Sequence, residues 1–535
     1  MPSIFDQGAT QWLQGIKGLN DSTPPGSRHE IMQGVPGIVP YTPDLLNVKV
    51  RFGNIFGRGG MGSYQGAIPS STSPIIGLFP YNRANGAANN LIRVTPTKLE
   101  LLVGSTWTDK TGVALNATSL TQPQFTIQND ILVYTMGGAI RPQGYGTNSG
   151  VAVAYATGTQ LGGTPPFAKC LTSYMQFLLL GNVSADGTFT DTFDGWRLIE
   201  YSDDPFYTWT NCNGNTIDLY QTPGDLVAMM PLGRVCMCYK TDGVIRLTWV
   251  GSSVRFTQEL IPGSVGCAAP LSVVDLGNFG HAYLGTNGII YHVTPTEIKA
   301  VSFEKLSNTL PPKLGLNRFR YARGYAVPTL DLYVLLYDRT GLAGQFLNSY
   351  VAWNYRSQEF VKGEIGQDVI ACCSYRSVND TQEVQLVSSN SLVQEFDSTT
   401  YSRDDNGNKV ERYWTSGWHK LADEEGYLYG VTVVMRKSPR ARIRVSLARN
   451  MSNLFEREQF FSLKGDGNSN SDFVECDYRL PSPVFGAWFN VRVDYYHDSV
   501  ASSTEQLRVG FISLAKHKVA SSPQQVGNTE PTIGN

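Results

Sequence analysis

Short runs of β-forming residues recur through the middle of the chain, and this recurrence restricts the fold more than any other feature. From about residue 70 to residue 400 the runs return roughly every 40 to 50 residues, separated by Gly, Asn, Asp or Pro. We group them into six units and a less distinct seventh. This period is typical of the blades of a β-propeller, whereas a parallel α/β fold would need helical segments that are almost absent. The sequence therefore predicts an all-β chain with a β-propeller over residues 70–400.

Three tight turns inside these units end in glycine. They are TDG at 241–243, TNG at 286–288 and DRTG at 338–341. Each lies between β-rich runs, where Gly supplies the positive φ that a tight hairpin requires. The turns therefore favour antiparallel pairing of the strands on either side.

The N-terminal flank, residues 1–69, is rich in Gly, Pro and Ser and shows little periodicity. We expect an extended N-terminal arm laid on a neighbour, with one short helix around Trp12, Leu13 and Ile16. A separate N-terminal domain is not expected.

The C-terminal flank has a different pattern. Runs such as YLYGVTVVMRK, ARIRVSLAR and AWFNVRVDYYHD alternate apolar and polar residues. This alternation predicts a small β-sandwich over residues 401–516. Residues 517–535 have no apolar anchors, so they are predicted to form a flexible C-terminal tail.

Charged residues make up 16% of the chain and the net charge is −2. Typical globular chains have roughly 25% charged residues, so much of this surface must be neutral and suited to protein contacts. Proteins that bind phosphates tightly are usually far more basic, so tight or sequence-specific DNA binding is not expected. The start, MPSIFDQGATQWLQG, does not resemble a secretory signal, and no apolar run approaches the roughly 20 residues of a membrane-spanning helix.

The cysteines and histidines do not form a pattern associated with chemistry. Most of the eight cysteines lie in apolar runs, which is typical of buried free thiols in a reducing compartment. Cys236 and Cys238 would share one face of a strand, but their spacing is not that of a zinc site. The six histidines are scattered without metal-site spacing. We therefore predict no metal, no cofactor and no catalytic set.

The stretch SDDPFYTW, residues 202–209, resembles the Asp-box turn of sialidase-like β-propellers, with Phe206 in place of the usual glycine. In such a turn Ser202, Asp204, Thr208 and Trp209 would satisfy backbone groups or pack into the blade. Neighbouring aspartates point to opposite sides of a strand, so Asp204 and the residue before it are poorly placed as a paired acid and base. We interpret the stretch as a structural turn. The alternative is a propeller glycoside hydrolase or a glycan-binding module.

One cluster of basic residues stands out near the C-terminus: Arg436, Lys437, Arg440, Arg442 and Arg444. Arg442 and Arg444 would share one strand face, because side chains alternate along a strand. The cluster is interpreted as a solvated strand face. The alternative is a patch that faces a partner protein or passing DNA.

Three segments carry a resemblance to a known family. They are Ser202 to Trp209, the run VIRLTWVG at 244–251, and the segment at 266–291 that begins GCAAPLSVVDLGNFG. Together they resemble the propeller region of bacteriophage tail hub or nozzle proteins, including packaged-DNA stabilisation proteins of short-tailed phages. The resemblance covers about residues 70–400, and a following β-sandwich is usual in this family.

The resemblance implies a structural virion protein without enzymatic activity. It implies a homo-oligomeric ring, six-fold in the relatives, that binds the portal-adaptor protein and tail fibres or spikes. Such a ring forms part of the tail conduit, retains packaged double-stranded DNA, and lets it pass at ejection. Assembly would take place in the bacterial host cytoplasm.

Overall fold

The computed structural model consists almost entirely of β-strands. The residues that it describes are 10–13, 19–21, 42–51, 54–64, 73–83, 90–147, 154–184, 198–202, 209, 216–251, 255–303, 305–310, 319–339, 346–376, 383–389, 391–398, 404–405, 408–416, 419–420, 426–437, 441–450, 452, 454–464, 473–486, 488–497 and 508–515.

The chain divides into two compact units. The larger contains Gly59–Val410 and Val500–Thr504, and the smaller contains Met1–Arg58, Glu411–Ser499 and Glu505–Asn535. The larger unit therefore begins before the predicted propeller boundary at residue 70 and ends after that at residue 400.

Five blades of the larger unit are separate four-stranded antiparallel sheets. The first contains β6 (Gly77–Tyr81), β7 (Asn90–Val94), β8 (Leu99–Val103) and β9 (Thr106–Asp109), and the second β10 (Gln124–Gln128), β11 (Ile131–Thr135), β12 (Gln143–Thr147) and β13 (Ala154–Gln160). The third contains β14 (Phe167–Tyr174), β15 (Phe177–Ser184), β16 (Leu198–Ser202) and β17 (Thr216–Asp218). The fourth contains β18 (Leu226–Leu232), β19 (Val235–Lys240), β20 (Val244–Trp249) and β21 (Phe256–Leu260), and the fifth β22 (Val274–Asp275), β23 (His281–Leu284), β24 (Ile290–Val293) and β25 (Ile298–Ala300).

The sixth and seventh blades share one long strand, β29 (Glu359–Tyr375). Its first part pairs with β28 and its last part with β30. The remaining strands of these blades are β26 (Arg323–Val327), β27 (Leu332–Tyr337), β28 (Leu347–Asn354), β30 (Val384–Ser389) and β31 (Leu392–Ser398). The short strands β32 (Asp404–Asp405) and β33 (Asn408–Lys409) extend the same sheet, and short 3-10 helices cover Pro270–Ser272 (η3), Gly277–Phe279 (η4) and Pro328–Leu330 (η6).

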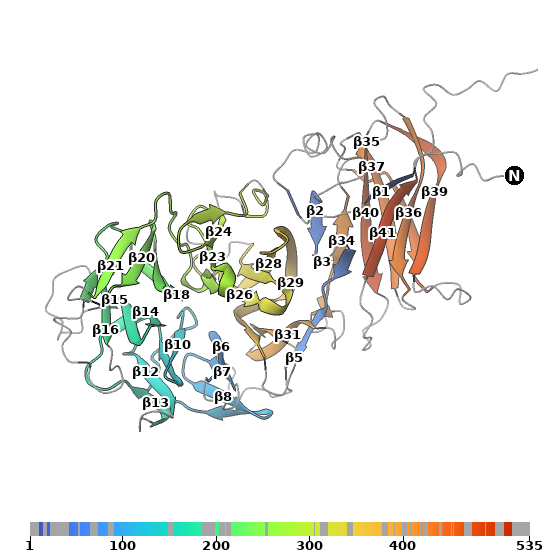
Figure 1. The fold of residues 1–535 in the computed structure, drawn as a ribbon. Coiled ribbons are helices and arrows are strands. Elements are labelled where there is room, and N and C mark those ends of the chain that lie inside the picture. Colours follow the sequence, from blue (N-terminus) through green and yellow to red (C-terminus); the bar gives the residue numbers. More distant parts are fainter. Residues whose placement is uncertain are drawn as a thin grey trace, which may run out of the picture. The chain divides into compact units, whose positions relative to one another are not determined.

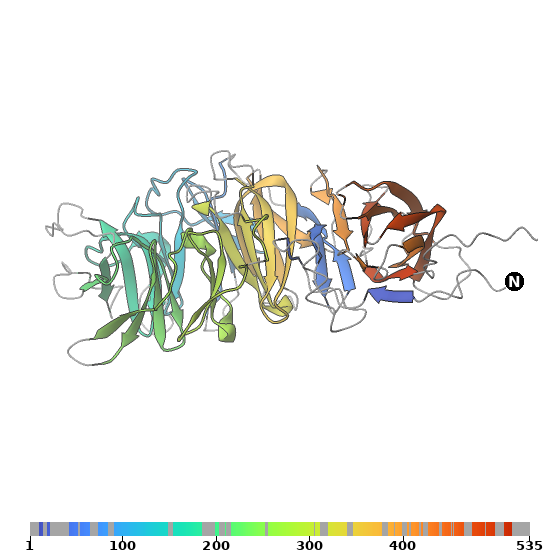
Figure 2. The ribbon, with the colours of Figure 1, turned by 90° about the horizontal axis from the view of Figure 1, so that it is seen from above.

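The ring is closed by a strand from near the N-terminus. β5 (Gly60–Ser63) pairs with β31 as the fourth strand of the seventh blade. β29 also packs against β6 of the first blade. Figure 1 shows the sheets following one another around a ring, and Figure 2 shows this ring from the side. The larger unit is therefore a β-propeller, and its described strands form seven blades.

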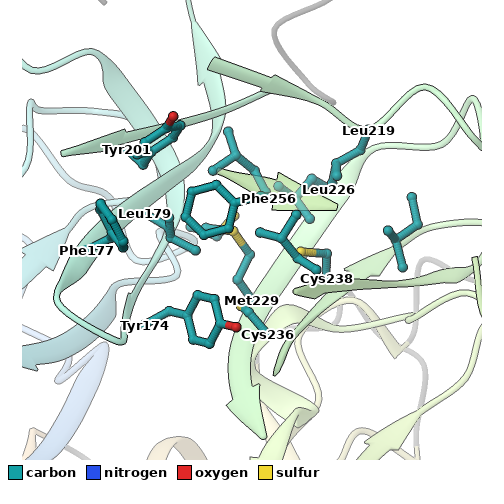
Figure 3. Packing of buried hydrophobic residues seen from close by; sticks show 14 residues of the cluster. Tyr174, Phe177, Leu179, Tyr201, Leu219, Leu226, Met229, Cys236, Cys238 and Phe256 are labelled. Atoms are coloured by element: carbon teal, nitrogen blue, oxygen red, sulfur yellow. The ribbon is translucent and has the colours of Figure 1, made fainter. Parts of the chain in front are cut away.

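The seams between blades are filled with apolar side chains. In the seam between the third and fourth blades, Leu179 packs with Cys236, Cys238 and Phe256 (Figure 3). Side chains alternate along β19, so Met237 and Tyr239, which are two residues apart, share the other face of the strand and fill the next seam. Both faces of this strand are buried, which explains why its sequence, VCMCYK, is an almost continuous apolar run.

The glycine-ended turns have two different causes. Gly288 has a φ of +77°, as predicted for a tight hairpin. The prediction is wrong at Gly243, whose φ is not positive. Instead, an added Cβ there would lie 3.3 Å from side-chain atoms of Leu260 and Ser264, so close packing favours glycine. Gly341 lies outside the described residues.

The smaller unit is a two-sheet β-sandwich with strands from both ends of the chain. One sheet has the order β3 (Val48–Arg51), β4 (Asn54–Gly57), β41 (Arg508–Ala515), β36 (Gly426–Arg436), β39 (Phe473–Gly486), and β1 (Thr10–Leu13) also pairs with β41. The other has the order β2 (Asp44–Leu46), β34 (Arg412–Thr415), β40 (Trp488–His497), β37 (Ala441–Arg449), β38 (Arg457–Ser462), and β35 (His419–Lys420) also pairs with β40.

The predicted N-terminal arm needs correction. Parts of residues 1–69 are strands of the sandwich, and β5 belongs to the propeller. The helix expected around Trp12 and Leu13 is wrong, because both residues lie in β1, whose backbone pairs with β41. Ile16 and the predicted tail at 517–535 lie outside the described residues.

Candidate functional site

Trp209 makes backbone and side-chain contacts where the second and third blades meet. Its backbone N–H donates to the Gly162 carbonyl at 3.0 Å, and its carbonyl accepts from Thr164 N–H at 2.7 Å. Its side chain is 2% exposed and packs in the seam between the second and third blades, against Leu161 and other apolar residues. The segment around Trp209 is thus held by both backbone and side chain.

Glycine at position 163 allows the two backbone segments to approach this closely. Its φ is +78°, and an added Cβ would lie 2.3 Å from the Trp209 carbonyl oxygen. A side chain at this position would therefore push the two segments apart. Trp209 and Gly163 are bridged in parallel.

Of the other three residues of the predicted turn, the structure describes only Ser202. Ser202 is the last residue of β16 and is 6% exposed. Asp204 and Thr208 lie outside the described residues. Burial of Ser202 and Trp209 agrees with a packing role, and the Asp-box turn itself stays a prediction.

The predicted basic cluster does not act as a free positive patch at Arg444. Its guanidinium contacts Asp494 on β40 at 3.3 Å and Glu458 on β38 at 3.4 Å. Arg442 lies two residues earlier on β37 and is exposed, while Lys437 is half-buried. Arg440 and the side chain of Arg436 lie outside the described part of the chain. The Arg444 contacts favour the solvated strand face.

Around Arg444 the outer face of this sheet carries a group of arginine and aromatic side chains that we did not predict from the sequence. We define the arginine–aromatic face as Tyr413, Arg444, Phe455, Phe460, Arg492 and Tyr496. The Arg492 guanidinium lies 3.8 Å from the Tyr413 ring centroid and 6.0 Å from that of Phe455. Arg444 and Phe460 both approach the Tyr496 ring, with centroid distances of 5.8 Å and 6.0 Å. The alternation in NVRVDYYH, which places Arg492 and Tyr496 on one face, was the signal in the sequence.

The buried thiols lie as the sequence analysis predicted for packing residues. Cys170, Cys236 and Cys238 are fully buried in the seam between the third and fourth blades. The pKa of Cys236 is raised by a hydrogen bond with Cys238 and by burial, which both disfavour the reactive thiolate. Within the described residues, no group of three or more His, Cys, Asp or Glu side chains is placed to hold a metal ion.

The histidine His281 is buried between the fourth and fifth blades. Its Nδ1 lies 2.8 Å from the Tyr239 hydroxyl and its Nε2 lies 2.9 Å from the Pro231 carbonyl oxygen. A carbonyl only accepts, so Nε2 carries the proton and Nδ1 accepts from Tyr239. Burial lowers the pKa of His281, and His292 lowers it further, whereas Asp275 and the Pro231 carbonyl oppose the shift.

We expect the free energy of unfolding to fall as pH drops below about 6.5, because His281 then binds a proton in the unfolded state but not in the folded state. Above that pH the contribution of His281 to the free energy of unfolding is fully present. Between pH 7.5 and 5.5 this residue should account for up to about 1.4 kcal/mol of the free energy of unfolding. Urea unfolding at both pH values, with His281→Gln for comparison, measures it. An unchanged pH difference in the variant would show that other groups cause the effect.

The centre of the propeller is crossed by side chains. The Gln122 amide, just before β10 of the second blade, donates to the Arg320 carbonyl, just before β26 of the sixth blade, at 2.8 Å. Gln124 on β10 similarly reaches the Val227 carbonyl of the fourth blade at 3.5 Å. These blades are not neighbours in the ring, so both contacts span the space around its axis.

Within the described part of the chain, no helix has the length and apolar character needed to cross a membrane.

Comparisons with known proteins gave structural likeness alone. No protein-family model and no curated protein sequence matches the chain. The WD40 domain of Pan2 from Neurospora crassa is similar with a TM-score of 0.37 and 11% identity, over 64% of this chain and 94% of that one. YCF48 from Cyanidioschyzon merolae has a TM-score of 0.36 and 9% identity, over 63% of this chain and 98% of that one. At such low similarity, the propeller assignment rests on the strand order and ring closure of this chain.

Proposed function

We propose that the chain is a non-enzymatic structural subunit of a short-tailed phage virion. In this proposal its copies form the nozzle or hub ring of the tail conduit, below the portal and its adaptor protein. The ring binds fibres or spikes, retains packaged DNA, and lets it pass at ejection.

The observation that carries the proposal is the resemblance of three segments that occupy consecutive blades. Ser202 and Trp209 flank the first segment, the second includes β20, and the third runs from the turn before η3 into β24. Buried members of these segments fill the seams between blades. The segments are therefore packing motifs, which identify a shared scaffold better than they identify an activity.

The contacts at the propeller centre bear on where DNA would pass. Loops of the second and sixth blades touch through Gln122 and Arg320, so a duplex has no room between them. In the proposed particle, the passage for DNA lies inside the ring of subunits and outside each propeller. The net charge of −2 suits such a passage, because each phosphate neutralised by Lys or Arg would slow sliding.

The proposal is tested by measuring the mass of the purified protein and imaging the particles. We expect a closed ring with a mass of six times the 58.8 kDa chain, alone or with its adaptor. A sialoside cleavage and binding assay on the same sample serves as the second measurement, with no activity expected. A monomer that cleaves or binds a sialoside would contradict the proposal and support the glycan-directed alternative.

A further inference from the structure

The side chain of Arg323 points into the seam between the sixth and seventh blades. Arg323 begins β26, which packs against β29 (Figure 1). Two residues further on, and therefore on the same face of β26, the Tyr325 hydroxyl donates to Oε1 of Gln385 on β30 at 2.9 Å. Gly324 between them faces the fifth blade, where an added Cβ would lie 2.7 Å from a methyl group of Val274. The Arg323 guanidinium therefore lies beside the seventh blade.

The positive charge of Arg323 is buried without a carboxylate to balance it. The residue is 8% exposed, and within the described part of the chain its guanidinium has neither a hydrogen-bond acceptor nor an ion-pair partner. Burial lowers the pKa of Arg323 to about 10, and the one group that opposes this shift is the Cys372 thiol on β29. Burial also raises the pKa of Cys372 to about 12, so at pH 7 the thiol is neutral and Arg323 is charged. Arg323 is thus a cation without a counter-charge.

Arg323 differs from the other deeply buried arginine, Arg93, in both charge balance and access. Arg93 has the Glu100 carboxylate at 2.7 Å, and its Nη atoms are sealed from solvent. None of the Arg323 nitrogens is sealed in this way, so a small molecule can reach them. The space is limited, because the Arg320 carbonyl, three residues earlier, meets Gln122 across the propeller centre. A small free anion therefore suits this position better than a segment of a partner protein.

We propose that Arg323 binds a small oxyanion, of the phosphate or carboxylate type, in the seam between the sixth and seventh blades. A guanidinium presents five N–H donors in a planar fork, which matches two oxygens of such an anion. The anion supplies the negative charge that the surrounding side chains do not, and so compensates the desolvated cation. Because it binds the folded chain, it also stabilises the propeller where these two blades meet. The proposal stands whether or not the chain is a virion protein.

Isothermal titration calorimetry of the full chain with inorganic phosphate, and separately with acetate, tests this proposal. At constant pH and ionic strength we expect saturable binding of one anion per chain, and the anion that binds more tightly identifies the preferred oxyanion. Saturable binding of neither anion would mean that water alone solvates Arg323, and would overturn the proposal.

Two arginine variants show whether the anion binds at Arg323. Arg323→Met removes the charge and the donors but keeps an apolar side chain, and it should weaken binding at least tenfold. Arg246→Met is the matched control, because Arg246 lies in the fourth blade and is already paired with Glu259. It should bind the anion like the unaltered chain. Unchanged binding by Arg323→Met would place the anion elsewhere and overturn the proposal.

Urea unfolding gives an independent measurement. Saturating phosphate should raise the unfolding midpoint of the unaltered chain and leave that of Arg323→Met unchanged. A shift of equal size in both would be a general salt effect and would count against the site. If Arg323→Met does not fold, Arg323→Lys takes its place, because it keeps the charge but loses the planar fork. Arg323→Lys should bind the anion about tenfold more weakly than the unaltered chain, and equal affinity would overturn the proposal.

Discussion

Replacing Glu100 with Gln is expected to lower the free energy of unfolding of the larger unit by about 3–5 kcal/mol. Glu100 and Arg93 form a cross-strand pair between β7 and β8, with Nε and Oε2 2.7 Å apart. The Arg93 side chain is fully buried, and its guanidinium lies 4.2 Å from the Trp107 ring centroid. Neither Nη atom has a hydrogen-bond partner among the described residues. Without the carboxylate, a buried positive charge is left uncompensated.

Urea unfolding of the full chain measures this loss, and the chain offers a matched control. Arg246 and Glu259 form the same kind of cross-strand pair on β20 and β21, but the Glu259 side chain is 62% exposed. Glu259→Gln should cost at most about 1 kcal/mol, because water already screens that pair.

The double variant Arg93→Met with Glu100→Leu separates charge from packing. Replacing both members of a buried ion pair with apolar residues is often neutral or stabilising, so most of the loss should be recovered. A double variant as unstable as Glu100→Gln alone would mean that shape, and not charge, is responsible.

The propeller could be predicted from sequence because its inner strands are buried on both faces. VCMCYK of β19 fills one seam with Cys236 and Cys238 and the next with Met237 and Tyr239, which produces a distinct apolar run. Such runs, separated by turn residues, repeat once per blade. The recurrence is therefore visible without knowledge of which strands pair.

Ring closure could not be predicted in the same way. The sequence of β5, GMGS, has little apolar content, and its partner Gln394 is more than 300 residues from Ser63. The N-terminal strands β2 and β4 of the sandwich also pair with β34 and β41, which follow the propeller in the sequence. These pairings depend on tertiary contacts that outweigh weak local preferences, and the expected helix around Trp12 was wrong for this reason.

The candidate sites could likewise be predicted only in part. Local sequence singled out Trp209, but its close partner Gly163 lies 46 residues earlier, and nothing near Trp209 indicates that contact. The basic cluster was identified by composition, whereas the carboxylates that meet Arg444 come from two other strands. Residue type was therefore readable from the sequence, and the partners that decide its role were not.

Trp209→Ala is expected to lower the free energy of unfolding by about 3–5 kcal/mol, as is usual for truncating a buried aromatic side chain. The indole is 2% exposed and fills the seam beside Leu161 and Leu180, so its loss leaves a cavity between two blades. Trp249 is a suitable control, because it belongs to the fourth blade and is 40% exposed. Trp249→Ala should therefore cost clearly less in the same urea titration.

Gly163→Ala tests the backbone contact between Gly163 and Trp209 without removing any apolar surface. Its Cβ would lie 2.3 Å from the Trp209 carbonyl oxygen, at a φ of +78° that disfavours any side chain. If this backbone contact holds the third blade against the second, Gly163→Ala should also unfold at a lower urea concentration. Loss of stability in Trp209→Ala alone would limit the role of the stretch to filling the seam. Loss in both variants would mean that the backbone contact at Gly163 fixes the segment as well, which is the role expected of a structural turn.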